Sequence, residues 1–199
     1  MLTGVVLAAG DSTRMGSPKA VLNAPDGRAF VARVIRTLLA ADLADLLVIT
    51  GRHHDLVVDA ITHDGLLEAV RIARNPDPSK GQLSSLLVGL DLVSSSSTEG
   101  LLMTLVDVPL VHVSTVTAVI DAWRRTRAPI VRPAIGNRHG HPVIFDRAVF
   151  EELRAAPLDA GAKSVVRAHE ATIVNVPVDD EGCLRDVDTP ADYDALSQE

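Results

Sequence analysis

The sequence predicts an α/β protein with a single-domain, three-layer Rossmann-like fold, in which helices cover both faces of a mostly parallel sheet. Three observations lead to this prediction. Short apolar runs alternate along the chain with amphipathic segments of helical period. The 199 residues suit one domain with a sizeable core. Hydrophobic residues make up 47% of the chain but aromatic residues only 3%, so the core must be built from aliphatic side chains.

The predicted elements alternate in chain order. Apolar and β-branched residues predict strands or extended segments at residues 5–8, 46–50, 70–73, 101–106, 129–132, 143–145 and 171–176. Apolar residues at helical spacing predict helices at residues 30–41, 56–61, 82–92, 113–126, 147–155, 162–169 and 190–196. Thr189 and Pro190 are residue types preferred at the N-cap and first turn of the last helix. Ligands of such sheets bind at the carboxyl ends of the strands, so the polar residues that follow strands are the candidate site.

Bulk properties exclude several classes of function. The formal net charge of −7 argues against a broad nucleic-acid surface, which would be basic. No apolar run reaches the roughly 18 residues of a membrane span, and the N-terminus lacks the pattern of a signal peptide. The single cysteine, Cys183, excludes an internal disulfide, and no neighbouring base marks it as a nucleophile. We therefore expect a cytoplasmic protein with no nucleic-acid or membrane partner.

The loop after the first strand carries the strongest functional signal. Residues 5–19 read VVLAAGDSTRMGSPK, in which small residues let the backbone approach a ligand while Arg14 and Lys19 supply two cations. The spacing of Gly10, Gly16 and Lys19 does not fit a Walker loop, and the G-x-G-x-x-G dinucleotide pattern is absent. The residues predict a loop that binds a polyphosphate, with an ordinary surface loop as the alternative.

This loop resembles the signature LAAG-x-S-x-R-M-G-x-P-K of the MobA/MocA-like nucleotidylyltransferases, which include the molybdenum-cofactor guanylyl- and cytidylyltransferases. The resemblance implies one MobA-like domain over residues 1–199, with the fold of the nucleotide-diphospho-sugar transferases. It assigns Arg14 and Lys19, with Asp107, to catalysis. It also implies a nucleotide site formed at this loop by Leu7, Ala8, Ala9, Gly10, Arg14 and Lys19.

A second segment of the nucleotide site is implied after the strand at 70–73. Asn75-Pro76, followed by Gly81 and Ser84-Ser85-Leu86, is similar to the family segment N-P…G-x-x-x-S-L. The start of a helix offers backbone donors to a ligand, and Asn75, Gly81, Ser84 and Ser85 would contact the nucleotide. Ser84 could equally be a plain first-turn residue of the helix.

Carboxylates suited to Mg²⁺ follow a buried strand and precede the last helix. Asp107 comes directly after the strand at 101–106, and a carboxylate there can bind Mg²⁺ or serve only a turn. The family's D-x-P motif favours the metal. Asp186-Val187-Asp188-Thr189-Pro190 is similar to the closing family motif D-[IV]-D-T-P-x-D. We favour Asp188 as the second metal ligand and keep Asp186 as the alternative.

An acceptor site is implied by the segment around His141. Gly136 to Pro142 looks like the family's G-x-x-G-H-P segment, so Arg138, Gly140, His141 and Pro142 would contact the acceptor substrate. A zinc site at His139 or His141 finds no third ligand of suitable spacing.

The resemblance implies a Mg²⁺-dependent nucleotidylyltransferase that transfers NMP from an NTP to a phosphorylated acceptor of molybdopterin type. Ala8-Ala9 stands where cytidylyl members carry L-A-A-G and guanylyl members tend to carry L-A-G-G, which favours CTP over GTP. A sugar- or alditol-phosphate nucleotidylyltransferase is one alternative. A nucleotide-binding accessory protein without turnover is another. A molybdenum enzyme or its chaperone is a possible protein partner. The missing glycine fingerprint argues against a nicotinamide-dependent reductase.

Overall fold

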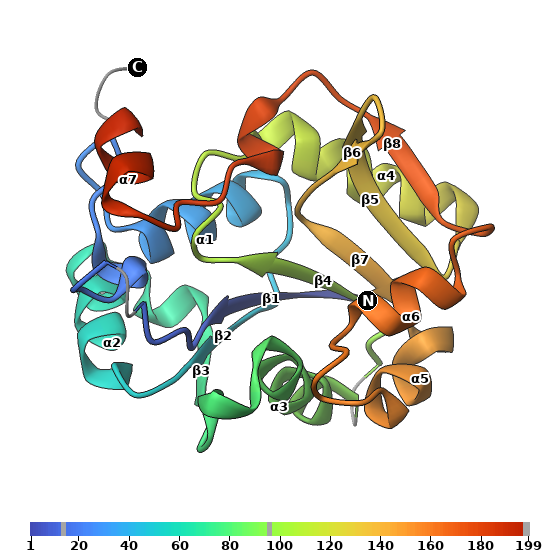
Figure 1. Ribbon diagram of the computed structural model, residues 1–199, viewed down its shortest axis with the longest axis horizontal. Helices are drawn as coiled ribbons and strands as arrows, with labels where there is room; N and C mark the ends of the chain where they lie inside the picture. Colours follow the sequence, from blue (N-terminus) through green and yellow to red (C-terminus); the bar gives the residue numbers. More distant parts are fainter. Residues whose placement is uncertain (13–14, 95–96, 197–199) are drawn as a thin grey trace.

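Eight strands form one twisted sheet in the computed structural model, which describes residues 1–12, 15–94 and 97–196 (Figure 1). The order along the sheet is β3–β2–β1–β4–β7–β5–β6, and β8 pairs with β5. The strands are β1 (Leu2–Ala8), β2 (Leu46–Thr50), β3 (Arg71–Arg74), β4 (Gly100–Leu105), β5 (Ile130–Ile135), β6 (Arg138–His139), β7 (Val143–Asp146) and β8 (Val174–Pro177).

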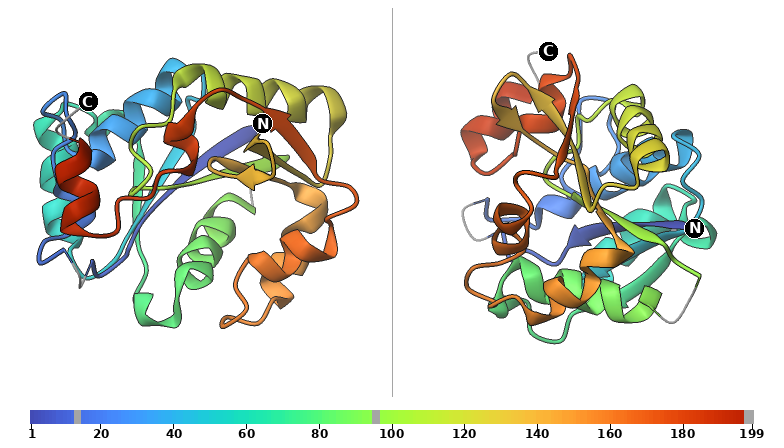
Figure 2. Two further views of the ribbon diagram at one scale, coloured as in Figure 1. Left: turned by 45° about the horizontal axis from the view of Figure 1, so that its top comes forward. Right: turned by 90° about the vertical axis from the view of Figure 1, so that its right-hand side faces the viewer.

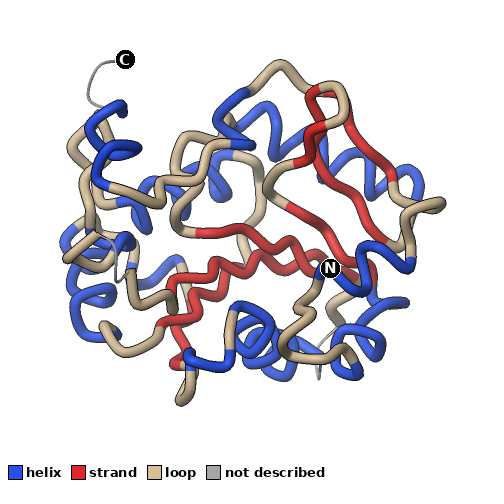
Figure 3. Tube along the Cα trace, viewed as in Figure 1, coloured by secondary structure: helices blue, strands red, loops and turns tan. Residues whose placement is uncertain are grey.

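The predicted mostly parallel sheet is confirmed, with one inverted region. Strands β3, β2, β1 and β4 pair in parallel, and so do β5 and β8. Strand β7 runs antiparallel between β4 and β5, and the short β6 forms a hairpin with β5. Antiparallel neighbours can be joined by short connections, so the chain from β5 to β7 needs no crossover helix. Figure 3 shows the continuous sheet with helices on both sides.

Helices cover both faces of the sheet, which gives the three layers (Figure 2). One core contains buried residues of α1 (Phe30–Ala40), α2 (His54–His63), α4 (Val113–Thr126) and α7 (Pro190–Leu196). The other contains those of α3 (Gln82–Ser94), α5 (Phe150–Ala155) and α6 (Lys163–Ala168). Val5 and Leu7 face the second core while Val6 and Ala8 face the first, since alternate side chains of a strand point to opposite faces.

Local hydrogen bonding explains the main departures from the predicted elements. The segment predicted as a helix at 147–155 begins as a 3₁₀ helix at Arg147–Val149, and the strand predicted from residue 171 begins at Val174. The backbone amides of Thr172 and Ile173 both donate to the carbonyl of His169, so these residues extend the turn after α6 instead of the sheet. No apolar pattern marks β6, which is exposed and two residues long.

The parallel strands bring three loops to one edge of the sheet. Leu7 lies beside Ile49 and Leu105 in the register, so the chain leaves β1, β2 and β4 at the same level. The approach is close, because a Cβ atom on Gly51 would lie 2.4 Å from the carbonyl oxygen of Ala9. This edge faces α7 in Figure 1. No helix in the described part of the chain has the length and apolar character needed to cross a membrane.

Candidate active site

A cavity of about 310 Å³ lies at the carboxyl ends of β1 and β4. This volume falls in the range of small-molecule sites. Its walls come from the loop after β1, the start of α3 and the residues after β4, joined by one residue near the C-terminus. The lining residues are Leu7, Ala8, Ala9, Gly10, Ser12, Lys19, Ala20, Pro78, Gly81, Gln82, Ser85, Leu105, Val106, Asp107 and Asp188.

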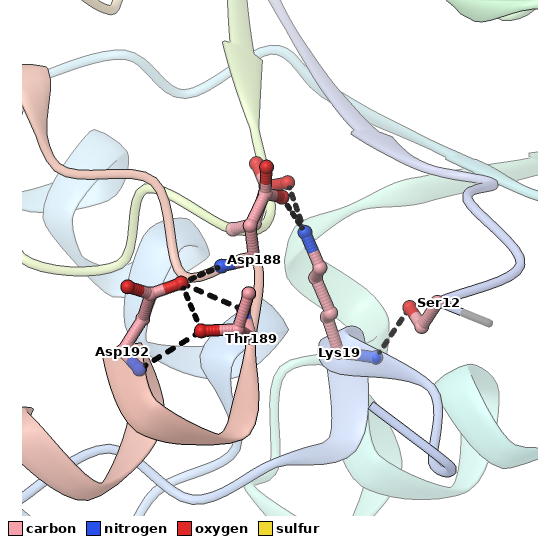
Figure 4. Close-up of polar contacts among 6 residues, drawn as sticks. Ser12, Lys19, Asp188, Thr189 and Asp192 are labelled. Carbon is pink, nitrogen blue, oxygen red and sulfur yellow. Dashed lines mark hydrogen bonds and ion pairs between the residues drawn. The ribbon is translucent and has the colours of Figure 1, made fainter. Parts of the chain in front are cut away.

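Lys19 joins three distant parts of the chain within this cavity. Its ammonium donates to Asp107 Oδ2 at 2.8 Å and to Asp188 Oδ1, and Figure 4 shows its side chain reaching toward Asp188. The side chain of Lys19 is only 12% exposed, so its charge depends on these partners. Burial would lower the pKa of Lys19, but the hydrogen bonds and charges of Asp107 and Asp188 outweigh burial and raise it. The ammonium therefore stays charged at neutral pH.

Ser12 closes the loop that carries Lys19. Its hydroxyl accepts a hydrogen bond from the backbone amide of Lys19 at 2.9 Å, and its carbonyl accepts from the amide of Met15 at 2.9 Å. Ser12 has a positive φ of 50°, which lets the chain turn sharply after Gly10. The predicted phosphate ligand Arg14 lies outside the described residues.

One carboxylate oxygen of Asp107, Oδ1, is suited to binding a divalent cation. Oδ1 is buried and finds no hydrogen-bond partner among the described residues, although Oδ2 accepts from Lys19. An unpartnered buried carboxylate oxygen is costly unless a cation or donor meets it. No group of three or more His, Cys, Asp or Glu side chains in the described part of the chain is arranged to hold a metal ion. A cation here would therefore use two carboxylates and complete its shell with substrate and water, as Mg²⁺ commonly does.

Asp188 reaches the site through the C-terminal strap, the segment of residues 180–192. The amide of Val187 donates to the carbonyl of Asp107 at 2.9 Å, which places Asp188 next to Asp107. The far end of the strap is fixed by Asp180, which is buried and accepts from the amide of His112 and the hydroxyl of Thr115. The strap therefore lies along the edge of the sheet where the cavity opens.

Asp186 adds a further negative charge near Asp107 and Asp188. Partial burial raises the pKa of Asp186, and the charges of Asp107 and Asp188 raise it further. Alternate residues of an extended segment point the same way, so Asp186 and Asp188 both act on this region. Asp188 contacts Lys19 and lines the cavity, whereas Asp186 does not line it.

The segment after β3 is organised by Asn75. Its buried side-chain amide donates to the hydroxyls of Ser84 and Ser85, both at 2.9 Å, and its carbonyl oxygen accepts from the amide of Asp77. The hydroxyl of Ser84 in turn donates to the carbonyl of Gly81 at 2.7 Å. Gly81 and Ser85 line the cavity, whereas Asn75 and Ser84 do not. Ser12 and Gln82 line the cavity without having been singled out from the sequence. Ser12 is the serine of the motif LAAG-x-S-x-R-M-G-x-P-K, and Gln82 directly follows Gly81. Both positions therefore lie in segments from which they could have been predicted as site residues.

The predicted acceptor residues form a separate group beside the cavity. None of Arg138, Gly140, His141 and Pro142 lines it. Arg138 is exposed and pairs with Glu181 at 2.5 Å. Gly140 lies against the strap, because a Cβ atom there would lie 2.0 Å from the carbonyl oxygen of Cys183, and the amide of His141 donates to that carbonyl.

His141 is buried and lies close enough to Asp107 for that charge to affect its pKa. Its ring Nδ1 is buried and has no hydrogen-bond partner among the described residues. Burial lowers the pKa of His141 to about 4, against the opposing charge of Asp107 and a hydrogen bond to the backbone of Met103. The imidazole is therefore neutral at pH 7 and keeps one ring nitrogen without a partner among the described residues.

Comparisons with known proteins identify the family. A family model described as MobA-like NTP transferase domain matches residues 4–173. The chain belongs to this family. It is 31% identical to nicotine blue oxidoreductase of Paenarthrobacter nicotinovorans, with 94% of this chain and 92% of that protein covered. It is 27% identical to a protein of Rhodopirellula baltica named probable molybdenum cofactor guanylyltransferase, with 96% and 89% covered.

Solved structures show the same fold. Rv0371c of Mycobacterium tuberculosis superimposes with a TM-score of 0.83 at 30% identity, covering 100% of this chain and 97% of that one. A complex of the same protein with manganese gives a TM-score of 0.77 at 28% identity, with 100% and 98% covered. These matches confirm the predicted family and fold class.

The lowered pKa of His141 predicts a specific dependence of stability on pH. The unfolded chain binds more protons at this residue between its ordinary pKa of 6.5 and its folded value of about 4, so stability falls as the pH is lowered through this window. We expect His141→Gln to reduce the loss in unfolding free energy between about pH 7 and pH 5 by about 1–2 kcal/mol. Urea unfolding of both proteins at each pH measures this difference. An equal loss in parent and variant would contradict the burial of the imidazole.

Proposed function

We propose that the protein is a Mg²⁺-dependent nucleotidylyltransferase that transfers NMP from an NTP to a phosphorylated acceptor and releases pyrophosphate. The observation that carries this proposal is the meeting of Lys19, Asp107 and Asp188 in one cavity beside a backbone loop of small residues. A cation next to carboxylates at the ends of parallel strands suits a triphosphate with its counter-ion. Membership of the NTP transferase family agrees with this chemistry.

In the proposed reaction, an acceptor phosphate oxygen bonds to the α-phosphorus while the bond to the β-phosphate oxygen breaks. Pyrophosphate leaves with the electron pair of that bond. Lys19 would neutralise phosphate charge, and the loop from Ala8 to Gly10 would position the nucleotide through its backbone. Asp107 and Asp188 would hold Mg²⁺, which when bound stabilises negative charge at the reacting phosphate. Arg14 would supply a further cation to the triphosphate.

The proposed acceptor is of molybdopterin type. Its support is the similarity to proteins named probable molybdenum cofactor guanylyltransferase in Rhodopirellula baltica and Mycobacterium avium. His141 and Gly140 would lie on the acceptor side, since both lie against the strap at Cys183 and the charge of Asp107 acts on His141, without either residue lining the nucleotide cavity.

An oxidoreductase is the second candidate, favoured by the 31% identity to nicotine blue oxidoreductase. Consumption of NAD(P)H without pyrophosphate release would support it. The sequence lacks the glycine fingerprint of dinucleotide-binding loops, which favours nucleotidyl transfer.

Pyrophosphate release from each of the four NTPs, with and without molybdopterin, tests the proposal. We expect release that requires both Mg²⁺ and the acceptor. Asp107→Asn should lower kcat/KM on the order of 10² or more with a near-parental melting temperature, because an amide of similar size is a poorer Mg²⁺ ligand. Asp194→Asn, on the exposed face of α7, is the matched control. Parental turnover by Asp107→Asn would remove this carboxylate from the reaction.

Two observations bear on the base and point in different directions. Ala9 is buried at the cavity, and its methyl group would take space from a purine bound there, which favours CTP. The relatives named guanylyltransferase favour GTP. We propose CTP as the preferred nucleotide. One methyl group discriminates by only about 10- to 200-fold, so the preference from this loop should stay within a few hundred-fold.

Ala9→Gly should narrow the difference in affinity between CTP and GTP without reversing it. The start of α3 also lines the cavity and would still contact the base. Calorimetric titration of parent and variant with each nucleotide measures this. Tighter binding of GTP by the parent would overturn the cytidylyl assignment and leave nucleotidyl transfer standing.

A further inference from the structure

Asp192 fixes the backbone on which Asp188 stands. Its Oδ2 accepts from the amide of Asp188 at 3.1 Å, the amide of Thr189 at 2.7 Å and the hydroxyl of Thr189 at 2.8 Å (Figure 4). The amide of Asp192 in turn donates to the hydroxyl of Thr189 at 3.2 Å. Thr189 and Asp192 thus form a capping box at the start of α7, as the N-cap prediction for Thr189 anticipated.

The bond from the amide of Asp188 goes beyond what a helix cap requires. A capping box joins the third helical residue to the cap residue, whereas here the same carboxylate oxygen also holds the residue before the cap. The preceding amide, of Val187, is held by the carbonyl of Asp107. The amides of Asp188 and Thr189 lie on either side of the Asp188 Cα and both donate to Asp192 Oδ2, which restricts the direction in which the Asp188 carboxylate can point.

Helix α7 has contacts of its own that do not involve Asp192. Leu196 is buried in the core, and the ring of Tyr193 lies 6.1 Å from that of Phe30, measured between centroids. The docking of α7 and the orientation of Asp188 therefore depend on different groups and can be separated by mutation.

We propose that Asp192 is a positioning residue that aims the Asp188 carboxylate, and through it sets the affinity of the Asp107–Asp188 pair for a divalent cation. This inference rests on the metal role of these carboxylates in the proposed function. Residues that orient ligating carboxylates by hydrogen bonds commonly change metal affinity by about 10- to 100-fold when they are removed.

The test is Mn²⁺ binding to the nucleotide-free protein. Binding is measured from the electron paramagnetic resonance signal of the Mn²⁺ that stays free in solution. We expect Asp192→Ala to weaken binding by about 10- to 100-fold. Asp192→Asn should stay within a few-fold of the parent, because its amide oxygen can accept the same backbone bonds. Asp194→Ala removes one negative charge from the same helix and controls for long-range electrostatics. Leu196→Ala loosens the packing of α7 while leaving the box in place.

Each outcome is decisive. Weakened binding in Asp192→Ala, with Asp192→Asn, Asp194→Ala and Leu196→Ala close to the parent, supports the positioning role. Equal affinity of Asp192→Ala and Asp194→Ala overturns it and leaves the proposed reaction untouched. An equal loss in Leu196→Ala also overturns it, since helix docking would then be the cause. A parent without saturable Mn²⁺ binding overturns the metal assignment and this inference together, whereas pyrophosphate release reports separately on the reaction.

Discussion

The contact of Lys19 with Asp107 and Asp188 is the interaction on which the site depends. Two carboxylates close together repel each other, and a nearly buried ammonium that binds both offsets this repulsion. The three residues come from the loop after β1, the end of β4 and the C-terminal strap, so the same contact also ties together segments that are far apart in the sequence. Removing Lys19 would leave two carboxylates without their cation, whereas removing one carboxylate would leave an intact ion pair.

Further hydrogen bonds keep this arrangement in place. Ser12 fixes the backbone of Lys19, Val187 joins the strap to Asp107, and Asp192 holds the amide of Asp188. Asn75 does the same for the opposite wall by binding Ser84 and Ser85. Among these orienting groups, Val187, Asp192 and Asn75 do not line the cavity, as expected for a supporting shell that holds the geometry of a site before a ligand arrives.

The sequence predicted those features that are local in the chain. The helices at residues 113–126 and 190–196 and the strand at 46–50 were predicted with the observed bounds, because their apolar periodicity and end residues are clear. The motif that contains Lys19 led to the family. The hydrogen bonds of Asn75 and the antiparallel direction of β7 could not be predicted from the sequence, because both depend on contacts between separate segments of the chain. Asp192 was visible in the closing motif, but its bond to Asp188 depends on the path of the strap.

Urea unfolding of Lys19→Met, with and without Mg²⁺, tests the central claim most directly. If Lys19 compensates Asp107 and Asp188, the variant should be less stable than the parent without divalent ions. Added Mg²⁺ should restore more stability to the variant than to the parent, because the ion then compensates the freed carboxylates. A variant as stable as the parent and insensitive to Mg²⁺ would contradict the account.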